Sequence, residues 1–256
     1  MLLAVDIGNT HTVLGIFRGD QLVAEWRLAS SAGLSVDDIW IAVKNRCADA
    51  GIPVSELDGV GISSVVPSLT DIFETIARKH LNVEPVTISA ALDLGFKIRY
   101  KDPMTLGADR LCNAVAGYKK FGGPLIIIDF GTATTYDVVS SERDFLGGAI
   151  ALGLQSSADE LSTRTAKLPK VDLRFPESAI GRDTIAGIQA GVMMGMIDSV
   201  EGMIRRIRNE IGQQAKVIAT GGLVSIIAKH TKMIEAYEPS LVLEGVRLIY
   251  KRVRGK

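Results

Sequence analysis

Two segments of the chain repeat one pattern of a carboxylate, a glycine and hydroxyl side chains. Residues 3–12 read LAVDIGNTHT and residues 126–135 read IIIDFGTATT, each an apolar run followed by Asp-x-Gly. The matched pairs are Asp6 with Asp129, Gly8 with Gly131, and Thr12 with Thr135. Each copy predicts a strand, a tight turn and an antiparallel return strand. Because glycine has no Cβ, backbone N–H groups and threonine hydroxyls in such a turn can approach phosphate oxygens closely.

The two aspartates add a condition to this phosphate site. A carboxylate beside a phosphate is unfavourable unless a cation bridges the two charges. One Asp-x-Gly alone is too short to indicate more than a hairpin turn. Two copies, each behind a buried strand, favour a duplicated α/β fold with a nucleotide cleft between two similar domains.

A loop-to-helix junction at residues 100–110 holds the second set of chemical groups. Pro103 and Gly107 punctuate the loop, and Asp109 and Arg110 lie in the first turn of an otherwise apolar helix. Helix-end electrostatics explains the aspartate but not the arginine, which the helix dipole opposes. In a kinase, Asp109 would accept the proton of a substrate hydroxyl as it attacks the γ-phosphate, and Arg110 would bind an anionic group. Spacing alone leaves both interpretations open.

Gly221 and Gly222 follow a buried strand at residues 216–220 and open a short helix. Two glycines at that place let a flat ring lie against the backbone, and a helix N-terminus favours phosphate nearby. In register with the two phosphate loops, this segment is a candidate adenosine site. An ordinary strand-to-helix turn is the alternative.

Two other segments are candidates for contact with a ligand or with a neighbouring chain. A long helix at residues 181–211 begins with Asp183 or Thr184 as its cap, and its N-terminus either faces ligand or is simply capped. Closely spaced glycines weaken the strand between residues 147 and 153. We therefore expect another protomer or the substrate to approach the backbone there.

Composition narrows the class of protein. The 256 residues are 47% apolar, enough for two cores, which we place at residues 1–120 and 121–256. Lys plus Arg and Asp plus Glu both number 29, which gives no support for nucleic acid or an anionic membrane as partner. No signal peptide or apolar stretch long enough to span a bilayer is visible. Cys47 and Cys112 are expected to be buried free thiols in a cytoplasmic protein.

The expected elements follow the order βββαβαβ in the first half, and the second half begins again at Leu125. Expected strands are 2–7, 11–18, 21–29, 58–65, 83–88, 125–129, 134–140, 145–150 and 216–220. Expected helices are 35–50 capped by Ser35, 68–80 capped by Ser68 or Thr70, 107–118, 153–165, 181–211 and 242–252.

Taken together, these motifs resemble those of a known family. The strings D-I-G-N-T at residues 6–10, G-A-D-R at 107–110 with Tyr100, D-F-G-T-A-T at 129–134 and G-G-A-I at 147–150 are similar to those of type III pantothenate kinases. That family belongs to the superfamily of acetate and sugar kinases, Hsp70 and actin. The resemblance implies duplicated actin-like (ribonuclease H-like) domains. It also implies ATP-dependent phosphorylation of pantothenate at its primary hydroxyl to 4'-phosphopantothenate, the first step of coenzyme A biosynthesis.

The resemblance also assigns roles to residues. Asp109 is the implied general base, and Asp129 is the implied ligand of a monovalent cation, potassium or ammonium. Magnesium would accompany ATP, and a homodimer would form around residues 147–153 and the long helix. The implied ATP contacts are Asp6, Ile7, Gly8, Asn9, Thr10, His11, Thr12, Val13 and Thr132, to which the adenosine candidates Gly221 and Gly222 are added. The implied pantothenate contacts are Tyr100, Gly107, Ala108, Asp109, Arg110 and, from the partner protomer, Thr184.

Two residues depart from the family pattern, and two other functions remain open. Leu152 lies where the family often has proline, and Asp183 where asparagine is usual, which affects local interface and pocket detail. Another small-molecule kinase of the same fold is the first alternative, and the segment from Tyr100 to Arg110 argues against it. A non-catalytic ATP-binding regulatory protein is the second, and an intact Asp109 argues against that.

Overall fold

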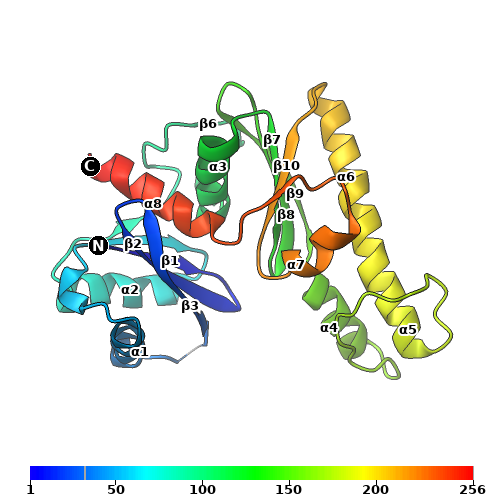
Figure 1. Ribbon diagram of the computed structural model, residues 1–256, viewed down its shortest axis with the longest axis horizontal. Helices are drawn as coiled ribbons and strands as arrows, with labels where there is room; N and C mark the ends of the chain where they lie inside the picture. Colours follow the sequence, from blue (N-terminus) through cyan, green and yellow to red (C-terminus); the bar gives the residue numbers. More distant parts are fainter. Residues whose placement is uncertain (32, 256) are drawn as a thin grey trace. The chain divides into compact units, whose positions relative to one another are not determined.

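The computed structural model describes residues 1–31 and 33–255 and consists of two compact units (Figure 1). The first unit comprises Met1–Lys119 and the chain from Ser240 onward, and the second comprises Lys120–Pro239. This division differs from the expected one in its last segment. Residues after 239 were expected in the second domain, but they pack with the first unit.

A mixed sheet forms the centre of the first unit, in the strand order β3-β2-β1-β4-β5. Its strands are β1 (Leu2–Ile7), β2 (His11–Arg18), β3 (Gln21–Ala29), β4 (Gly59–Ser64) and β5 (Val86–Thr87). β1 pairs antiparallel with β2 and parallel with β4. The predicted βββαβαβ order is therefore observed. A further short strand, β6 (Lys97–Ile98), and two 3-10 turns, Val54–Glu56 and Pro103–Thr105, also belong to this unit.

Helices α1 (Val36–Asp49) and α2 (Pro67–His80) pack together and share one apolar core with the sheet, to which Leu3, Val43 and Phe73 contribute. Ser35 caps α1 as predicted, in a capping box with Asp38. The expected cap of α2 at Ser68 or Thr70 is wrong. Val66 is the N-cap and Pro67 starts the helix, because proline lacks the N–H that a first-turn residue leaves unbonded anyway.

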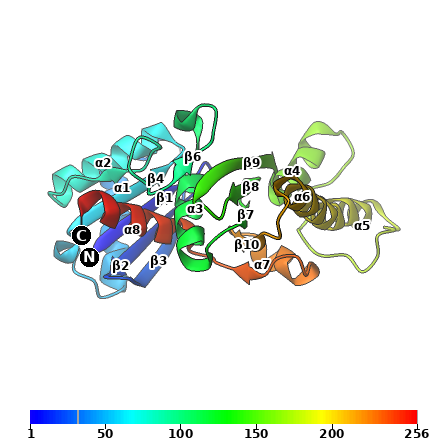
Figure 2. The same ribbon diagram turned by 90° about the horizontal axis from the view of Figure 1, so that it is seen from above.

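Helix α8 (Leu241–Arg254) packs on the opposite face of the same sheet, where the strands carry glycines (Figure 2). A Cβ at Gly61 would lie 2.7 Å from Cγ1 of Val246, so the missing side chain makes room for the helix. Gly245 of α8 likewise lies against the backbone of Cys112 in α3 (Ala108–Phe121), and a Cβ at Gly245 would collide with it. These close contacts explain why the C-terminal helix belongs to the first unit.

The second unit repeats the plan of the first. Its sheet contains the order β11-β10-β7-β8-β9, and its strands are β7 (Leu125–Phe130), β8 (Ala133–Val139), β9 (Asp144–Leu152), β10 (Lys216–Thr220) and β11 (Ala236–Tyr237). β7 pairs antiparallel with β8 and parallel with β10, as β1 does with β2 and β4. The sequence repeat is therefore a structural repeat.

The predicted long helix consists of α5 (Thr184–Gln189), a π-helical turn at Ala190–Met194, and α6 (Gly195–Ile211). Side chains of α6 such as Val200 and Ile204 share a buried core with Ile126 and Ile128 of β7. The remaining helices of this unit are α4 (Leu154–Arg164), α7 (Val224–Ile227) and the 3-10 turn Ala228–His230.

Two further expectations concern thiols and membranes. Cys47 and Cys112 are free and buried, as predicted. Among the described residues, no helix combines the length and apolar character that crossing a bilayer requires.

Candidate functional site

The turn between β1 and β2 is tight and open to solvent. The N–H of Gly8 donates to the carbonyl oxygen of His11 over 3.0 Å, and a Cβ at Gly8 would lie 3.1 Å from that oxygen. Asn9, Thr10 and His11 are exposed. Thr12 is only 3% exposed and its hydroxyl pairs with that of Ser30 at 2.9 Å. Its hydroxyl was expected to face phosphate, but it stabilises the strand pair instead.

Asp6, at the end of β1, is brought near the expected base within the first unit. Oδ1 of Asp6 accepts a hydrogen bond of 2.9 Å from the buried hydroxyl of Ser63 on β4. The Cys112 thiol of α3 lies close enough to both carboxylates that burial, then the charge of Asp6, then that of Asp109 raise its pKa well above the ordinary value. The fold therefore gathers both expected acidic residues around one buried thiol.

Asp109 lies in the first turn of α3, two residues after Gly107. Its Oδ1 accepts a hydrogen bond of 2.8 Å from the N–H of Arg110, and a Cβ at Gly107 would lie 2.5 Å from the same oxygen. Burial raises the pKa of the Asp109 carboxyl, while the hydrogen bond and the charge of Arg110 partly oppose this shift. A carboxylate whose pKa is raised is a stronger base, which suits proton removal from a hydroxyl.

Arg110 is 6% exposed, which is unusual for a guanidinium. Its Cζ lies 6.0 Å from the ring centre of Tyr100, a cation–π distance. The structure thus brings together Tyr100, Gly107, Ala108, Asp109 and Arg110, which the sequence assigned to one substrate site. A buried, always-charged group beside a carboxylate base is suited to hold an anionic substrate.

In the second unit, Asp129 is the next-to-last residue of β7 and lies against the glycine pair that follows β10. A Cβ at Gly221 would lie 2.5 Å from Oδ1 of Asp129 and 2.6 Å from the N of Phe130. Gly221 also has a φ of +96°, a conformation that favours glycine. The expected adenosine segment is therefore packed directly on the expected cation ligand.

The Gly131–Thr132 turn is braced from the other side. The carbonyl oxygen of Thr132 accepts hydrogen bonds from the N–H of Gly153 at 3.1 Å and the hydroxyl of Ser156 at 2.9 Å. A Cβ at Gly153 would collide with the carbonyls of Gly131 and Thr132. Thr134 is fully buried. Of the expected phosphate contacts in this turn, Thr132 is the more open.

The structure explains the glycines in and after β9 by close backbone contacts that the sequence did not show. A Cβ at Gly148 would collide with the backbone of Tyr136 on β8, and Gly153 faces the Gly131–Thr132 turn. The close approach expected from a second protomer or substrate therefore comes, at these two positions, from the same chain. The exposed apolar side chains of β9 include Leu146 at 40% and, in its far part, Ile150 at 63% and Leu152 at 53%.

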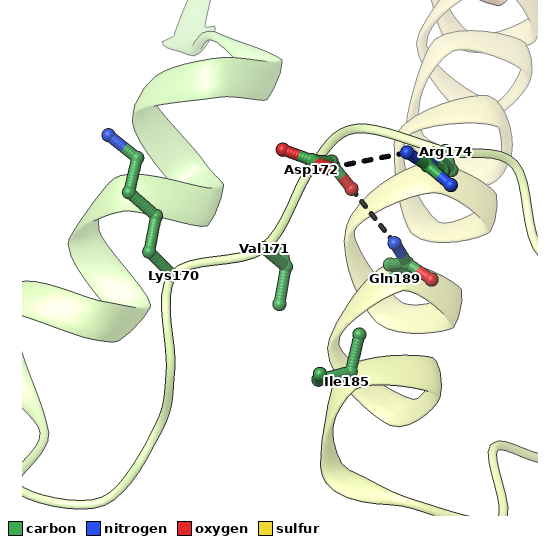
Figure 3. Close-up of a pocket in the computed structure, with 6 residues that line it drawn as sticks. All are labelled: Lys170, Val171, Asp172, Arg174, Ile185 and Gln189. Carbon is green, nitrogen blue, oxygen red and sulfur yellow. Dashed lines mark hydrogen bonds and ion pairs between the residues drawn. The ribbon is translucent and has the colours of Figure 1, made fainter.

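Thr184 starts α5, and the carboxylate of Asp183 caps the helix by accepting from the N–H of Ala186 at 2.9 Å. The next residue, Ile185, lines a cavity of about 380 Å³ together with Lys170, Val171, Asp172, Arg174 and Gln189 (Figure 3). Thr184 itself is exposed. Asp183 therefore performs the capping expected of it, whether or not the family has asparagine there.

Asp129 has the chemistry of a cation ligand, because carboxylate oxygens are donors that hard cations prefer. The carbonyl oxygens of Gly131 and Thr132 in the following turn face Gly153, and that of Thr132 accepts hydrogen bonds from the N–H of Gly153 and the hydroxyl of Ser156.

The sequence model of the family described as type III pantothenate kinase matches residues 2–206. The chain belongs to the type III pantothenate kinase family. A curated type III pantothenate kinase of Moorella thermoacetica is 44% identical to this kinase over 252 residues, which are 98% of this chain and 99% of that protein. One of Thermomicrobium roseum is 43% identical over 253 residues, covering 99% and 98% of the two chains.

Solved structures support the fold of this kinase. The activator of 2-hydroxyisocaproyl-CoA dehydratase from Clostridium difficile, solved with bound ADPNP, superposes with a TM-score of 0.60 at 14% identity. The superposition covers 99% of this kinase and 96% of that chain. At this identity the likeness concerns the fold alone, which is the duplicated actin-like α/β fold expected from the repeated motifs.

Sequence reasoning missed the residues that support the site of this kinase. Ser63 and Cys112 contact or adjoin the acidic pair, while Gly153 and Ser156 hold the Thr132 turn. One signal was available for Ser63. It lies near the end of the strand predicted at residues 58–65, and the carboxyl ends of neighbouring parallel strands meet at the same edge of a sheet.

Proposed function

We propose that this protein transfers the γ-phosphoryl group of ATP to the primary hydroxyl of pantothenate, forming 4'-phosphopantothenate, the first step of coenzyme A biosynthesis. The observation that carries the proposal is the identity of 44% over nearly the full chain with a type III pantothenate kinase. The grouping of Asp109, Arg110 and Tyr100 at one helix start supports it independently.

In the proposed mechanism, Asp109 is the general base. The substrate hydroxyl gives its proton to the Asp109 carboxylate as its oxygen attacks the γ-phosphorus of ATP and ADP leaves. Burial, which raises the pKa of this carboxyl, makes the carboxylate a better proton acceptor. Arg110 holds the anionic end of the substrate, and Tyr100 fixes the guanidinium by stacking on it.

ATP contacts come from Asp6, Ile7, Gly8, Asn9, Thr10, His11 and Val13 in the first unit and from Thr132, Gly221 and Gly222 in the second. Thr12 is left out, because its buried hydroxyl pairs with that of Ser30. The exposed turn of Asn9, Thr10 and His11 supports the first group. The contact of Gly221 with Asp129 supports the second. Magnesium bound with ATP neutralises charge on the phosphates, as in phosphoryl transfer generally.

Asp129 is the ligand of a monovalent cation, potassium or ammonium, in this proposal. A singly charged cation at this place offsets the repulsion between the Asp129 carboxylate and phosphate oxygens. The place of the Asp129 carboxylate, against the glycine pair of the expected adenosine segment, supports the assignment.

The working form is a homodimer in which Thr184 of one protomer reaches the substrate of the other. Exposed apolar side chains support an interface: Ile180 is 81% exposed and Ile185 is 50% exposed, on either side of the exposed Thr184. Ile150 and Leu152 of β9 extend the apolar surface of this unit. The free thiols Cys47 and Cys112 support a cytoplasmic location.

An assay of ADP release separates this function from its alternatives. The protein is supplied with Mg·ATP in potassium buffer, with pantothenate, with a panel of sugars and carboxylates, and with no acceptor. Turnover that depends on pantothenate supports the proposal. Turnover on another acceptor identifies a different kinase of the same fold, and ATP binding without turnover identifies a regulatory protein.

A further inference from the structure

Ser63, at the carboxyl end of β4, has no part in the roles assigned above. It is fully buried, and its hydroxyl donates to Oδ1 of Asp6 over 2.9 Å. The two residues are partners in the parallel pairing of β1 with β4, so their side chains leave the same face of the sheet. A hydrogen bond to a carboxylate is charge-assisted, and water cannot replace a donor that is fully buried.

The Cys112 thiol lies on the same face. Cys112 is fully buried and lies one helical turn after Asp109, so α3 presents both side chains in one direction. Burial and the charges of Asp6 and Asp109 raise the pKa of this thiol, and Ser63 partly opposes the rise. The Ser63–Asp6 pair therefore lies beside the start of α3.

The second unit contains the same pairing of residue types. Asp129 is the partner of Thr220 in the parallel pairing of β7 with β10, and Thr220 is 1% exposed. In both halves of the molecule, the aspartate before the glycine turn faces a buried hydroxyl residue on the neighbouring parallel strand. Two occurrences in sequences that otherwise differ indicate a requirement of the site rather than an accident of packing.

We propose that Ser63 is a positioning residue that holds the Asp6 carboxylate in the orientation in which it meets the Mg·ATP complex. The proposal rests on the proposed role of Asp6 in ATP binding. Without the hydrogen bond, Oδ1 of Asp6 loses a fully buried donor, so the orientation of the carboxylate is less firmly held. Loss of a hydrogen bond that orients a ligand of a metal typically lowers metal affinity or activity by about 10–100-fold.

The test compares Ser63→Ala with a matched control. Thr87 of β5, in the same unit, donates its hydroxyl to Oε1 of Glu74 over 2.6 Å, so Thr87→Val also removes a hydroxyl–carboxylate bond. We expect Ser63→Ala to lower kcat by about 10–100-fold and to raise the Mg²⁺ concentration for half-maximal rate at fixed ATP. The KM for pantothenate should change little, because the base and the arginine are untouched. Thr87→Val should leave all three unchanged.

A double-mutant cycle shows whether Ser63 acts through Asp6. In an Asp6→Asn background, adding Ser63→Ala should cause no further fall in kcat. An equal fall in both backgrounds, or equal losses in Ser63→Ala and Thr87→Val that follow their melting temperatures, would overturn the proposal. Should the alanine variant not fold, the isosteric Ser63→Cys, whose thiol is a weaker donor, replaces it with the same outcomes.

Failure of the proposed function is recognised separately. A wild-type protein that never turns over pantothenate contradicts that function and leaves the role of Ser63 to be decided by ATP binding. Calorimetric titration with ATP, with and without Mg²⁺, then gives the answer. We expect Mg²⁺ to tighten ATP binding to wild type and to do so much less for Ser63→Ala. The same Mg²⁺ dependence in both proteins would contradict the proposal.

Discussion

The carboxylate of Asp129 lies against the backbone of Gly221, at a separation that leaves no room for a side chain. A methyl group at Gly221 would lie 2.5 Å from Oδ1 of Asp129, and the φ of +96° adds strain for any other residue. This contact joins the end of one parallel strand to the turn after its neighbour. Small changes here should therefore affect the proposed cation site before they affect the rest of the fold.

Gly221→Ala and Asp129→Ala should both weaken the response to potassium. Wild-type activity is expected to be low in sodium or Tris buffer and to recover on adding potassium or ammonium, since a cation offsets the charge between Asp129 and phosphate. Both variants should raise the apparent KM for ATP and flatten the potassium titration. Gly202→Ala, where nothing lies within 4 Å of the added Cβ, is the control. Equal wild-type rates with and without potassium or ammonium would refute the cation site.

Asp109→Asn should separate activity from stability. The amide keeps the shape of the carboxyl group and can still accept from the N–H of Arg110, but it cannot take a proton, so kcat should fall by roughly 10²–10⁴-fold. Burial disfavours the ionised carboxyl in the folded protein, as its raised pKa shows, so the neutral variant should melt at the same temperature or higher at pH 7. Near-normal turnover of pantothenate by this variant would exclude Asp109 as the base.

The acid side of the pH profile should report the same carboxyl. Only ionised Asp109 can accept a proton, so kcat falls as the pH drops through its pKa, which burial has raised above the ordinary value of 3.8. The midpoint of the acidic limb should therefore lie above 3.8. Asp102→Asn, which changes an exposed carboxyl of the preceding loop, should leave the limb in place. If Asp102→Asn shifts the acidic limb, the limb does not report Asp109 and the prediction is wrong.

Mixing two inactive variants tests the shared site. Asp109→Asn and a disruptive Thr184 substitution lie on different protomers of each composite site, so a mixed dimer has one site with both lesions and one with neither. Random exchange makes about half of the dimers mixed, and activity should recover to about a quarter of wild type by twofold symmetry. No recovery after demonstrated subunit exchange would mean that each protomer has a complete site of its own.

The sequence was sufficient for the repeat and its strands, because Asp-x-Gly behind a buried run leaves few local alternatives. It was insufficient where contacts between residues distant in the sequence determine the position of an element or a side chain. The position of α8 depends on Gly61 and Gly245, whose missing side chains match Val246 and the Cys112 backbone only once the chain has folded. The hydrogen bond that engages the Thr12 hydroxyl likewise involves a distant residue, Ser30, eighteen residues further along the chain. Ser63 went unassigned because its partner Asp6 is distant in sequence.

The most direct test of the account is to identify the product. Purified protein is incubated with Mg·ATP, potassium and pantothenate, and the product is examined by mass spectrometry and phosphorus NMR beside an identical reaction with Asp109→Asn. The account predicts one phosphate on the primary hydroxyl of pantothenate, formed by wild type and nearly absent with the variant. Unmodified pantothenate with the wild-type protein, or phosphate at another position, would contradict it.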